Sequence, residues 1–432
     1  MLLPAKIGEA LAETVRSGRR RHGGASPTVG LFGGFGSGNI GNDASLEAML
    51  GFLRSSYPEL VLDVMCGGPK IVTERYDIAA VPVHWHPKRD VMGSRPLMVA
   101  QKALGKVVDA LRIAAWVRRH DVVIVPGMGI LETSLPLRAW QFPLTMFVLC
   151  VSGRVLGTRV ALVSIGVDEI NQRLNRWLLI TAARCAAYRS YRDDMSQAAA
   201  RRQGVNCLGD NVYRDLVFGR SVPDSISVDS QTVGIGVMDY YGGSDEPSSR
   251  GDDIHRSYLK KLRSFGRWLL DNGYKVRLFV GDSNGSDARV LNDVLTDLRE
   301  YRPDLDPSWV AAEPTLTFAE LARAMGPAGT VIATRYHNII CALMLSKPTI
   351  SIEYSAKNSA LMAGMGMAEY CQSIGSLDVP LLTEQFTTLQ RHGSSVRQQI
   401  AECTAGSQLL VERQFAELSA WLWCEYVGQS GC

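Results

Sequence analysis

The sequence has almost no excess charge, no regularly spaced cysteines and no long apolar run. Lys and Arg outnumber Asp and Glu by 46 to 43, a net charge of +3, whereas nucleic-acid-binding domains usually carry a strongly basic balance. Nucleic acid is therefore not expected as a partner. The nine cysteines show no CxxC or other metal-ligand spacing, so we predict free thiols in a reducing compartment and no metal site.

No apolar run reaches the ~18 residues that a membrane span requires. The best candidate, residues 142–156, is short and contains Arg154. Residues 1–27 include a basic run but lack the continuous apolar core of a signal peptide. We therefore expect a cytoplasmic protein, in which residues 1–27 form an N-terminal extension made of a helix and a loose linker.

From residue 28 onward, short β-branched runs alternate with longer amphipathic segments, the pattern of parallel strands covered by helices. In the first half this pattern predicts strands over 28–33, 59–65, 121–126 and 159–165, and helices over 43–55, 97–119 and 170–185. In the second half it predicts strands over 232–238, 275–280, 330–334 and 348–353, and helices over 254–271 and 286–300. A stretch rich in Ser, Pro and Asp at 219–231 has the composition of a linker.

The predicted fold class is therefore α/β, with two Rossmann-like domains at 28–220 and 232–405 that face a cleft. This arrangement resembles the glycosyltransferase-B architecture. The final segment, 406–432, carries apolar positions that include Phe415 and Trp421. It predicts a C-terminal helix that crosses the domain junction.

Arg335 and His337 follow the β-branched strand at 330–334, and Lys357 follows the next strand. Ligands of parallel sheets bind at the carboxyl ends of the strands, where the N-terminus of the next helix favours anions. We expect the three side chains to converge on one anionic ligand. His337 is the candidate proton-transfer group, because imidazole titrates near neutral pH.

The first strand opens into a glycine-rich loop that matches the pattern GxGxxG at Gly36, Gly38 and Gly41. Such glycines let the backbone approach a ligand closely, and Asp63 lies at the distance expected of a dinucleotide's ribose partner. Asn39 and Asp43 instead suit sugar hydroxyls or a helix N-cap. The plainer alternative is a tight turn in which Asp43 caps the following helix.

Three further features each allow two interpretations. His84 and His86 share one face of a candidate strand and either bind a metal, although no third ligand is apparent, or contact a sugar or lie at the surface. The apolar stripe of the helix at 102–119, which also carries arginines, either packs on the sheet or touches an anionic bilayer. Asp287, after the strand near 276–280, either orients a substrate or caps the next helix.

Two separated motifs occur together: an AsnXGlyAsnAsp loop at 39–43, and an ArgTyrHis strand end at 335–337 followed by ProThrIleSerIleGluTyrSerAlaLys. With the intervening segments 121–131, 188–196 and 212–218, they resemble the polysaccharide pyruvyl transferase family over roughly residues 28–370. The family usually has three successive glycines where this chain has Gly127, Met128 and Gly129.

The resemblance implies transfer of a pyruvyl group from phosphoenolpyruvate to two hydroxyls of one sugar, with formation of a cyclic ketal and release of phosphate, and without a cofactor. Arg192, Arg335 and His337 match the family's donor-binding positions, and His337 can serve the proton-transfer steps because imidazole titrates near neutral pH. Lys357 is a further donor-binding candidate, because a carboxylate and a phosphate need at least two cations. The implied acceptor side, on the opposite domain, comprises Gly38, Asn39, Gly41, Asp43, Gly127 and Gly129.

The main alternative is a nucleotide-sugar-dependent glycosyltransferase of the two-domain type, because the same fold and ArgTyrHis site suit a sugar diphosphate. A non-catalytic carbohydrate-binding protein is the other alternative. For the pyruvyl transferase, the expected partners are phosphoenolpyruvate and a carbohydrate acceptor. A lipid-linked acceptor places the protein at the inner face of the membrane.

Overall fold

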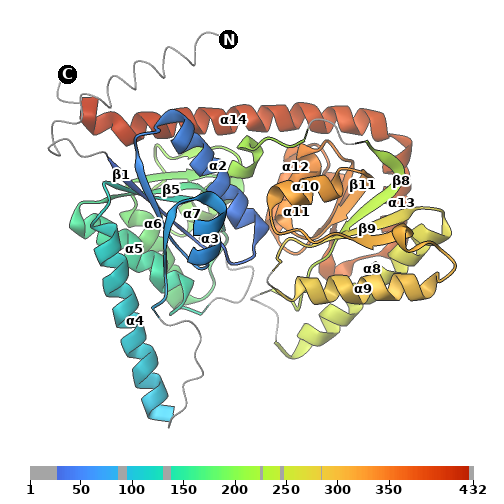
Figure 1. Ribbon diagram of the computed structural model, residues 1–432, viewed down its shortest axis with the longest axis horizontal. Coiled ribbons are helices and arrows are strands. Elements are labelled where there is room, and N and C mark those ends of the chain that lie inside the picture. Colours follow the sequence, from blue (N-terminus) through green and yellow to red (C-terminus); the bar gives the residue numbers. More distant parts are fainter. Residues whose placement is uncertain are drawn as a thin grey trace.

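The computed structural model describes residues 27–85, 95–129, 138–223, 227–243, 248–283 and 285–427. Two parallel α/β units lie side by side, and one long C-terminal helix runs along both (Figure 1). Nearly all of the predicted extension at 1–27 lies outside the described residues, as does His86. Every helix in the described ranges is too short or too polar to cross a bilayer.

The first unit is a seven-stranded parallel sheet in the order β3-β2-β1-β4-β5-β6-β7. Its strands are β1 (Thr28–Gly33), β2 (Val61–Cys66), β3 (Ala79–Pro82), β4 (Val122–Pro126), β5 (Arg159–Ile165), β6 (Tyr188–Tyr191) and β7 (Asn211–Val212). Its helices are α2 (Ile40–Ser56), α3 (Pro69–Tyr76), α4 (Arg95–Val117), α5 (Phe142–Leu156), α6 (Arg173–Cys185), α7 (Asp194–Arg202) and the 3₁₀ turn η1 (Leu216–Gly219).

The second unit is a six-stranded parallel sheet in the order β10-β9-β8-β11-β12-β13. Its strands are β8 (Asp229–Gly236), β9 (Lys275–Phe279), β10 (Val310–Ala312), β11 (Ala328–Ala333), β12 (Thr349–Glu353) and β13 (Cys371–Ser373). Its helices are α8 (Gly251–Asp271), α9 (Asp287–Tyr301), α10 (Phe318–Met325), α11 (Tyr336–Met344), α12 (Ala356–Gly364) and α13 (Val379–Arg391), with the 3₁₀ turns η2 (Ser248–Arg250), η3 (Pro307–Trp309), η4 (Ala368–Tyr370) and η5 (Ile374–Ser376).

The central strands are apolar throughout because helices cover both faces of each sheet. Every residue of β4 and of β11 is buried, as expected of parallel strands that lack a solvent-facing side. The two α/β units and the doubly wound strand order agree with the predicted fold class.

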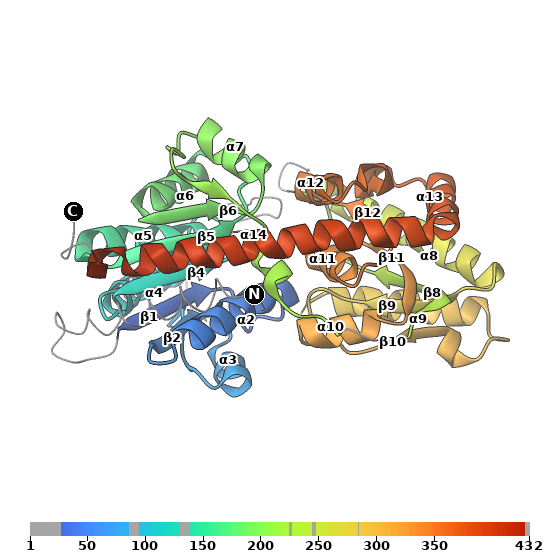
Figure 2. The same ribbon diagram turned by 90° about the horizontal axis from the view of Figure 1, so that it is seen from above.

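The C-terminal helix α14 (Gly393–Val427) joins the two units (Figure 2). On the second unit, the Thr404 hydroxyl donates to the carbonyl of Leu343 at 3.2 Å. On the first unit, the Glu417 carboxylate accepts hydrogen bonds from Tyr188, at 2.9 Å, and from Tyr213. The predicted helix across the junction is therefore present, and it begins at residue 393, thirteen residues before the expected start at 406.

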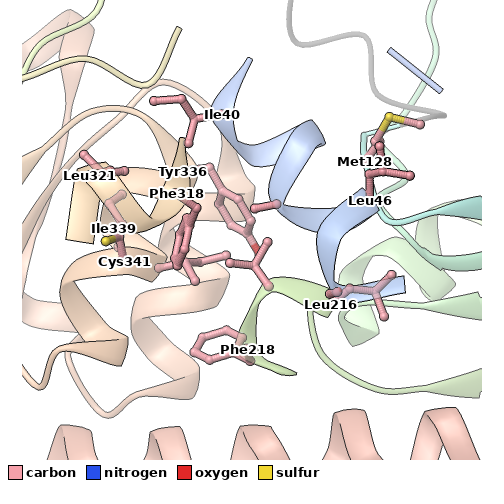
Figure 3. Close-up of a cluster of buried hydrophobic side chains, with 14 of the residues drawn as sticks. Ile40, Leu46, Met128, Leu216, Phe218, Phe318, Leu321, Tyr336, Ile339 and Cys341 are labelled. Atoms are coloured by element: carbon pink, nitrogen blue, oxygen red, sulfur yellow. The ribbon is translucent and has the colours of Figure 1, made fainter. Parts of the chain in front are cut away.

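The units also meet through an apolar contact near the middle of the molecule. In Figure 3, Ile40 of α2 lies beside Phe318 and Leu321 of α10, on the opposite unit. Each of the three side chains is 1 % exposed or less. The hydrophobic core is therefore continuous from one unit to the other, which fixes the distance between the loops on either side of the junction.

Some predicted boundaries are wrong. Strand β8 begins at Asp229, inside the predicted linker at 219–231. Residues 142–156, considered only as a membrane span, form helix α5 between β4 and β5. Helix α2 begins at Ile40 rather than 43, since the Asn39 side chain accepts the N–H groups of the first turn and starts the helix earlier.

Candidate active site

Both sheets reverse their strand order beside the first strand of the unit, between β1 and β4 in one and between β8 and β11 in the other. Ligands of open parallel sheets bind at such switch points, outside the carboxyl ends of the strands. The glycine-rich loop follows β1, and Arg335 stands two residues beyond β11. The residues predicted from the sequence therefore lie at the switch points of both sheets.

The glycine-rich loop is bonded directly to the second unit. The Ile40 N–H donates to the carbonyl of Gly281 at 3.2 Å, and the Ser283 N–H donates to the carbonyl of Gly38 at 2.9 Å. Asn39 forms an antiparallel β-bridge with Asp282, which lies between Gly281 and Ser283. Residues 281–283 follow β9, so the carboxyl ends of the two sheets meet at this contact.

The loop itself is held by a buried carboxylate. Gly36 and Gly38 adopt φ values of 67° and 97°, in the left-handed region that favours glycine. The Asp43 carboxylate accepts the Gly36 N–H at 2.7 Å and the Arg75 guanidinium at 3.0 Å. Burial raises the pKa of Asp43 above its usual range, against the opposing effect of these two donors.

The alternative in which Asp43 caps the following helix is wrong, because Asn39 caps it. The Asn39 side chain accepts the N–H groups of Gly41 and Asn42 at 3.1 and 3.2 Å. The side-chain oxygens of Asn39 and Asp43 therefore hold their own loop in shape. A contact of either residue with an acceptor sugar stays a prediction.

His337 lies where the two units touch. A β-carbon added to Gly41, on α2, would stand 1.9 Å from the Nδ1 atom of His337, so only glycine leaves room for the imidazole ring. The Nε2 atom lies 3.7 Å from the Oδ2 atom of Asp215, the residue just before η1. The first unit therefore contacts the ring of His337 on two sides.

Asp215 is 1 % exposed and lies between two cationic or titratable groups. Its Oδ2 atom is 3.5 Å from Arg192 Nη1, and its Oδ1 atom accepts the Val217 N–H at 3.1 Å. Burial acts to raise the pKa of this carboxyl. His337, Arg192 and the Val217 N–H together outweigh that effect and hold the pKa below its usual range.

Arg192 and Lys357 come together on one aromatic ring. The Arg192 guanidinium lies 4.5 Å from the ring centroid of Tyr336, and the Lys357 ammonium lies 5.6 Å from the same centroid. Tyr336 directly precedes His337 in α11. Two predicted donor-binding residues, one from each unit, thus lie beside the predicted proton-transfer residue.

Arg335 was also predicted to bind the anionic donor, but its side chain is bound to a buried carboxylate. Its Nε and Nη2 atoms donate to the two oxygens of Asp287, both at 2.8 Å, and Asp287 is fully buried. This bidentate pair uses two of the five N–H groups, which leaves both N–H groups of Nη1 and one of Nη2 for a ligand. Asp287 does not cap α9, as the sequence suggested; it holds Arg335 and accepts the Asp239 N–H at 2.9 Å.

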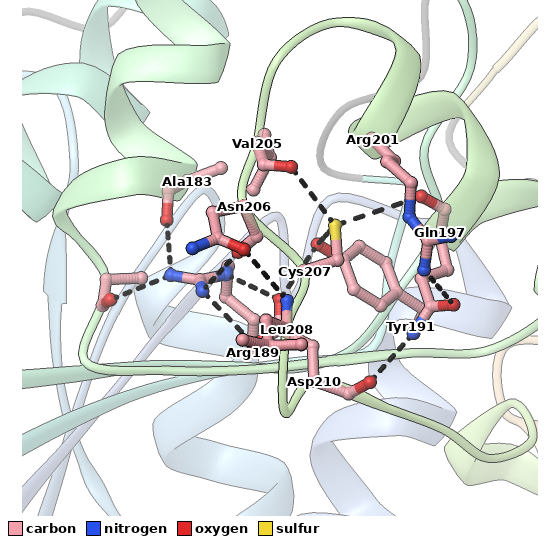
Figure 4. Close-up of polar contacts among 11 residues, drawn as sticks. Ala183, Arg189, Tyr191, Gln197, Arg201, Val205, Asn206, Cys207, Leu208 and Asp210 are labelled. Atoms are coloured by element: carbon pink, nitrogen blue, oxygen red, sulfur yellow. Dashed lines mark hydrogen bonds and ion pairs between the residues drawn. The ribbon is translucent and has the colours of Figure 1, made fainter.

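Arg192 follows β6, whose position is fixed by a network of polar contacts (Figure 4). The Arg189 guanidinium donates to both oxygens of Asp210, at 2.8 and 3.1 Å. The Tyr191 hydroxyl lies 3.3 Å from the Cys207 sulfur. These contacts tie β6 to the segment before β7, so Arg192 projects from a rigid strand end.

The turn after β4 packs against α2 and the loop after β1. Gly127 has a φ of 59°, and a β-carbon there would stand 2.6 Å from the Ser45 hydroxyl. Met128 has a φ of 70°, which normally favours glycine, and its sulfur lies 3.5 Å from the Gly34 nitrogen. Gly129 follows at the end of the described turn. Met128 thus takes the place of the usual middle glycine with its side chain buried.

The other predicted features have local partners. The Asp63 carboxylate accepts Trp116 Nε1 at 2.8 Å and lies 2.9 Å from His120 Nε2. His84 pairs with Asp109 at 3.0 Å. Within the described ranges, no group of three or more His, Cys, Asp or Glu side chains is placed to hold a metal ion.

Sequence reasoning placed Asp215 in the family-like segment 212–218 but gave no role to it or to Tyr336. Tyr336 belongs to the ArgTyrHis motif, so its place beside His337 was visible in the sequence. Asp215 lies more than a hundred residues before His337, and only the docking of the two units brings them together.

Solved structures with a similar fold include nucleotide-sugar enzymes. The UDP-GlcNAc 2-epimerase from Neisseria meningitidis bound to UDP-GlcNAc has 12% identity and a TM-score of 0.55, covering 91% of this chain and 99% of that one. The UDP-GlcNAc 2-epimerase from Methanocaldococcus jannaschii has 10% identity and a TM-score of 0.54, covering 84% and 92%. The spinosyn rhamnosyltransferase SpnG has 14% identity and a TM-score of 0.50, covering 89% and 99%.

Identities this low establish the shared fold alone, which is glycosyltransferase-B-like. The sequence itself carries the closer relationship. A model of the polysaccharide pyruvyl transferase family matches residues 39–356, which hold the end of the glycine-rich loop, Arg192, Asp215 and His337. The chain therefore belongs to the polysaccharide pyruvyl transferase family and is a transferase enzyme of polysaccharide biosynthesis.

Proposed function

We propose that the enzyme moves a pyruvyl group from phosphoenolpyruvate to two hydroxyls of one sugar, forms a cyclic ketal and releases phosphate. The acceptor sugar belongs to a polysaccharide, a glycolipid or a lipid-linked precursor of the cell envelope. The observation that carries the proposal is the cluster at the junction, where Arg192 and Asp215 of the first unit meet Tyr336 and His337 of the second.

The charges at the junction suit a small dianionic or trianionic donor. Phosphoenolpyruvate carries a carboxylate and a phosphate, and Arg192 and Lys357 both lie against the Tyr336 ring. Guanidinium and ammonium groups are the usual ligands of these anions. Arg335 can add only the N–H groups that its bidentate pair with Asp287 leaves, two on Nη1 and one on Nη2.

The reaction requires balanced proton transfers. The vinyl carbon of the donor gains one proton, each of the two sugar hydroxyls loses one, and the second proton leaves with the phosphate. His337 moves protons between these atoms, since imidazole accepts and donates protons at neutral pH. The Asp215 carboxylate, 3.7 Å from Nε2, stabilises the positive charge that forms when the ring is protonated.

The acceptor site of the proposal lies on the first unit, around the loops after β1 and β4. Gly38, Asn39, Gly41 and Asp43 belong to the first loop, and Gly127 and Gly129 to the second. The reaction takes place in the cytoplasm, at the inner face of the membrane when the acceptor is lipid-linked. No cofactor takes part, and phosphoenolpyruvate is a substrate.

The test is phosphate release from phosphoenolpyruvate with a panel of free and lipid-linked sugars. Release should depend on an acceptor sugar. His337→Gln should lower turnover about 10²- to 10⁴-fold, because the amide cannot move a proton. The exposed His392, at the end of α13, is the matched control, and His392→Gln should leave turnover unchanged.

Donor binding can be measured separately from turnover. Phosphoenolpyruvate alone should raise the melting temperature, since a ligand at 100 times its Kd stabilises the native state by about 2.7 kcal/mol. His337→Gln should keep this shift. Near-normal turnover of His337→Gln across pH 6 to 9 would reject its catalytic role.

A nucleotide-sugar-dependent glycosyltransferase is the second candidate, because the fold is similar to that of a rhamnosyltransferase and of an epimerase bound to UDP-GlcNAc. Release of a nucleoside diphosphate from a nucleotide sugar, together with no phosphate release from phosphoenolpyruvate, would favour it over pyruvyl transfer.

A further inference from the structure

Helices α4, α5 and α6 form one layer of the first unit, on the opposite side of its sheet from α14 (Figures 1 and 2). Helix α5 packs between the other two. The amino-terminal half of α4 extends beyond the sheet in Figure 1. The outer face of this layer, called here the α4–α6 face, plays no part in the junction between the units.

The charge of this layer is strongly one-sided although the whole chain is nearly balanced. Residues 101–117, 138–156 and 173–185 contain eight lysines and arginines and a single acid, Asp109. Asp109 is buried and binds His84, the Trp85 N–H and Lys106, so among the described residues Lys106 is the one cation of the layer that it pairs with. The α4–α6 face therefore presents cations without an exposed carboxylate of its own helices to neutralise them.

Large apolar side chains lie among these cations. Seven of them are more than half exposed: Leu104, Val107 and Leu111 of α4, Trp140 just before α5, Val155 near its end, and Leu174 and Trp177 of α6. The three residues of α4 are spaced by three and four positions, so they form one stripe. Val107 and Leu111 belong to the predicted apolar stripe of this helix, and their exposure shows that this part of the stripe does not pack on the sheet; the buried apolar residues among the described side chains of α4 are Ile113, Trp116 and Val117.

Arg173 and Arg176 flank the exposed residues of α6. Both are exposed, and neither makes an ion pair with a described residue. The ring of Trp177 rests on Phe147 of α5, with centroids 5.1 Å apart, so it is held at the surface. A surface that combines tryptophan, cations and apolar side chains is typical of proteins that bind the interface of a bilayer.

We propose that the α4–α6 face binds the surface of a membrane that contains anionic phospholipid. The positive charge of the face favours a membrane over a second copy of the chain as its partner, because two copies would bring like charges into contact. An anionic bilayer instead attracts each cation by about 1 kcal/mol, which is about 5-fold in affinity. The inference goes beyond the proposed function, since it needs neither the donor nor the acceptor.

The experiment is co-sedimentation of the full chain with vesicles of phosphatidylcholine alone or mixed with phosphatidylglycerol. We expect binding only to the mixed vesicles, with an affinity that falls as salt is added. Arg173→Gln/Arg176→Gln should weaken it about 25-fold, from about 5-fold for each cation. Lys260→Gln/Arg391→Gln, two exposed cations of the second unit, is the control and should bind as the native protein does.

The apolar contribution is tested with Leu104→Ser/Leu111→Ser, which should also weaken binding to the mixed vesicles. Equal binding to both kinds of vesicle, no binding, or unchanged binding of Arg173→Gln/Arg176→Gln would each overturn the proposal. A dimer that Leu104→Ser/Leu111→Ser converts to a monomer, without vesicle binding, would show that a second copy covers the face. Phosphate release with a free sugar is measured on every variant, so failure of the proposed function is seen separately.

Discussion

Replacing Asp215 with Asn tests whether one buried carboxylate supports both the junction and the reaction. The amide keeps the size of the side chain and the acceptor for the Val217 N–H, but it removes the negative charge between Arg192 and His337. Removing one partner of a buried ion pair costs about 3–5 kcal/mol. The separations of 3.5 and 3.7 Å exceed hydrogen-bond length, and Arg192 also has Asp193 at 3.6 Å. We therefore expect about 3 kcal/mol.

For a unit of this size, a loss of about 3 kcal/mol lowers the melting temperature by about 6–12 °C. The difference from the native protein should depend on pH in one direction. Because the pKa of Asp215 is held below its usual range, its contribution is present above the ordinary value of 3.8 and is lost as the pH falls through the native value. The two proteins should therefore become more alike only below about pH 4.

Turnover of Asp215→Asn should fall about 10²-fold or more, since the protonated ring of His337 loses its counter-charge. Asp63→Asn is a matched control, because Asp63 also binds a histidine, His120, at 2.9 Å but lies away from the junction. It should lower stability and leave turnover unchanged when assayed well below its melting temperature. Native stability and native turnover in Asp215→Asn would refute the reasoning.

Three other substitutions test separate contacts. Gly41→Ala should displace His337 by about 1 Å or more and lower turnover about 10²-fold. Gly51→Ala, on the same helix, is the control, because a β-carbon there meets no atom within 4 Å. It should keep turnover and add up to about 1 kcal/mol of stability. Arg335→Lys should weaken donor affinity in a calorimetric titration and lower the melting temperature as well, because lysine cannot keep the bidentate pair with the buried carboxylate; equal affinity and melting temperature would contradict this. Burial, with the nearby charge of the Arg397 guanidinium, lowers the pKa of Lys347 from 10.5 to about 8. Between these two pH values the unfolded protein therefore binds more protons than the native protein, and the free energy of unfolding rises with pH. Urea unfolding should show Lys347→Met more stable by up to about 3 kcal/mol at pH 7, with a gain that shrinks as the pH rises; a gain independent of pH would refute it.

The central strands of both sheets were predictable from the sequence. Residues 28–33 and 159–165 were expected as strands and form β1 and β5 with the same limits, because strands buried on both faces are continuous apolar runs. The short strands β3, β6, β7, β10 and β13, which lie at or next to the edges of the sheets, were not expected. Runs of two to four residues carry almost no periodic pattern, and their neighbours in the sheet define them.

Helix α5 was missed for a related reason. Packed against both α4 and α6, it is apolar on most sides and lacks the polar face that marks an amphipathic helix. In the site, the strand ends located Arg335 and His337 correctly at the carboxyl edge of a sheet. The partner of Arg335 could not be read from the sequence, because Asp287 is a carboxylate 48 residues away that meets it only after β9 and β11 have formed one sheet.

The position of α14 has a consequence for the order in which the molecule folds. Glu417 binds Tyr188, Asn211 and Tyr213, residues that lie 229, 206 and 204 positions earlier in the chain. At a synthesis rate of about 5–20 residues per second, the edge of the first sheet leaves the ribosome about 10–40 s before this partner does. During that interval the aromatic residues that later meet α14, among them Phe52 and Tyr57, have no cover from it. The first unit is thus synthesised first, but its packing is completed last, when α14 binds it and joins it to the second unit.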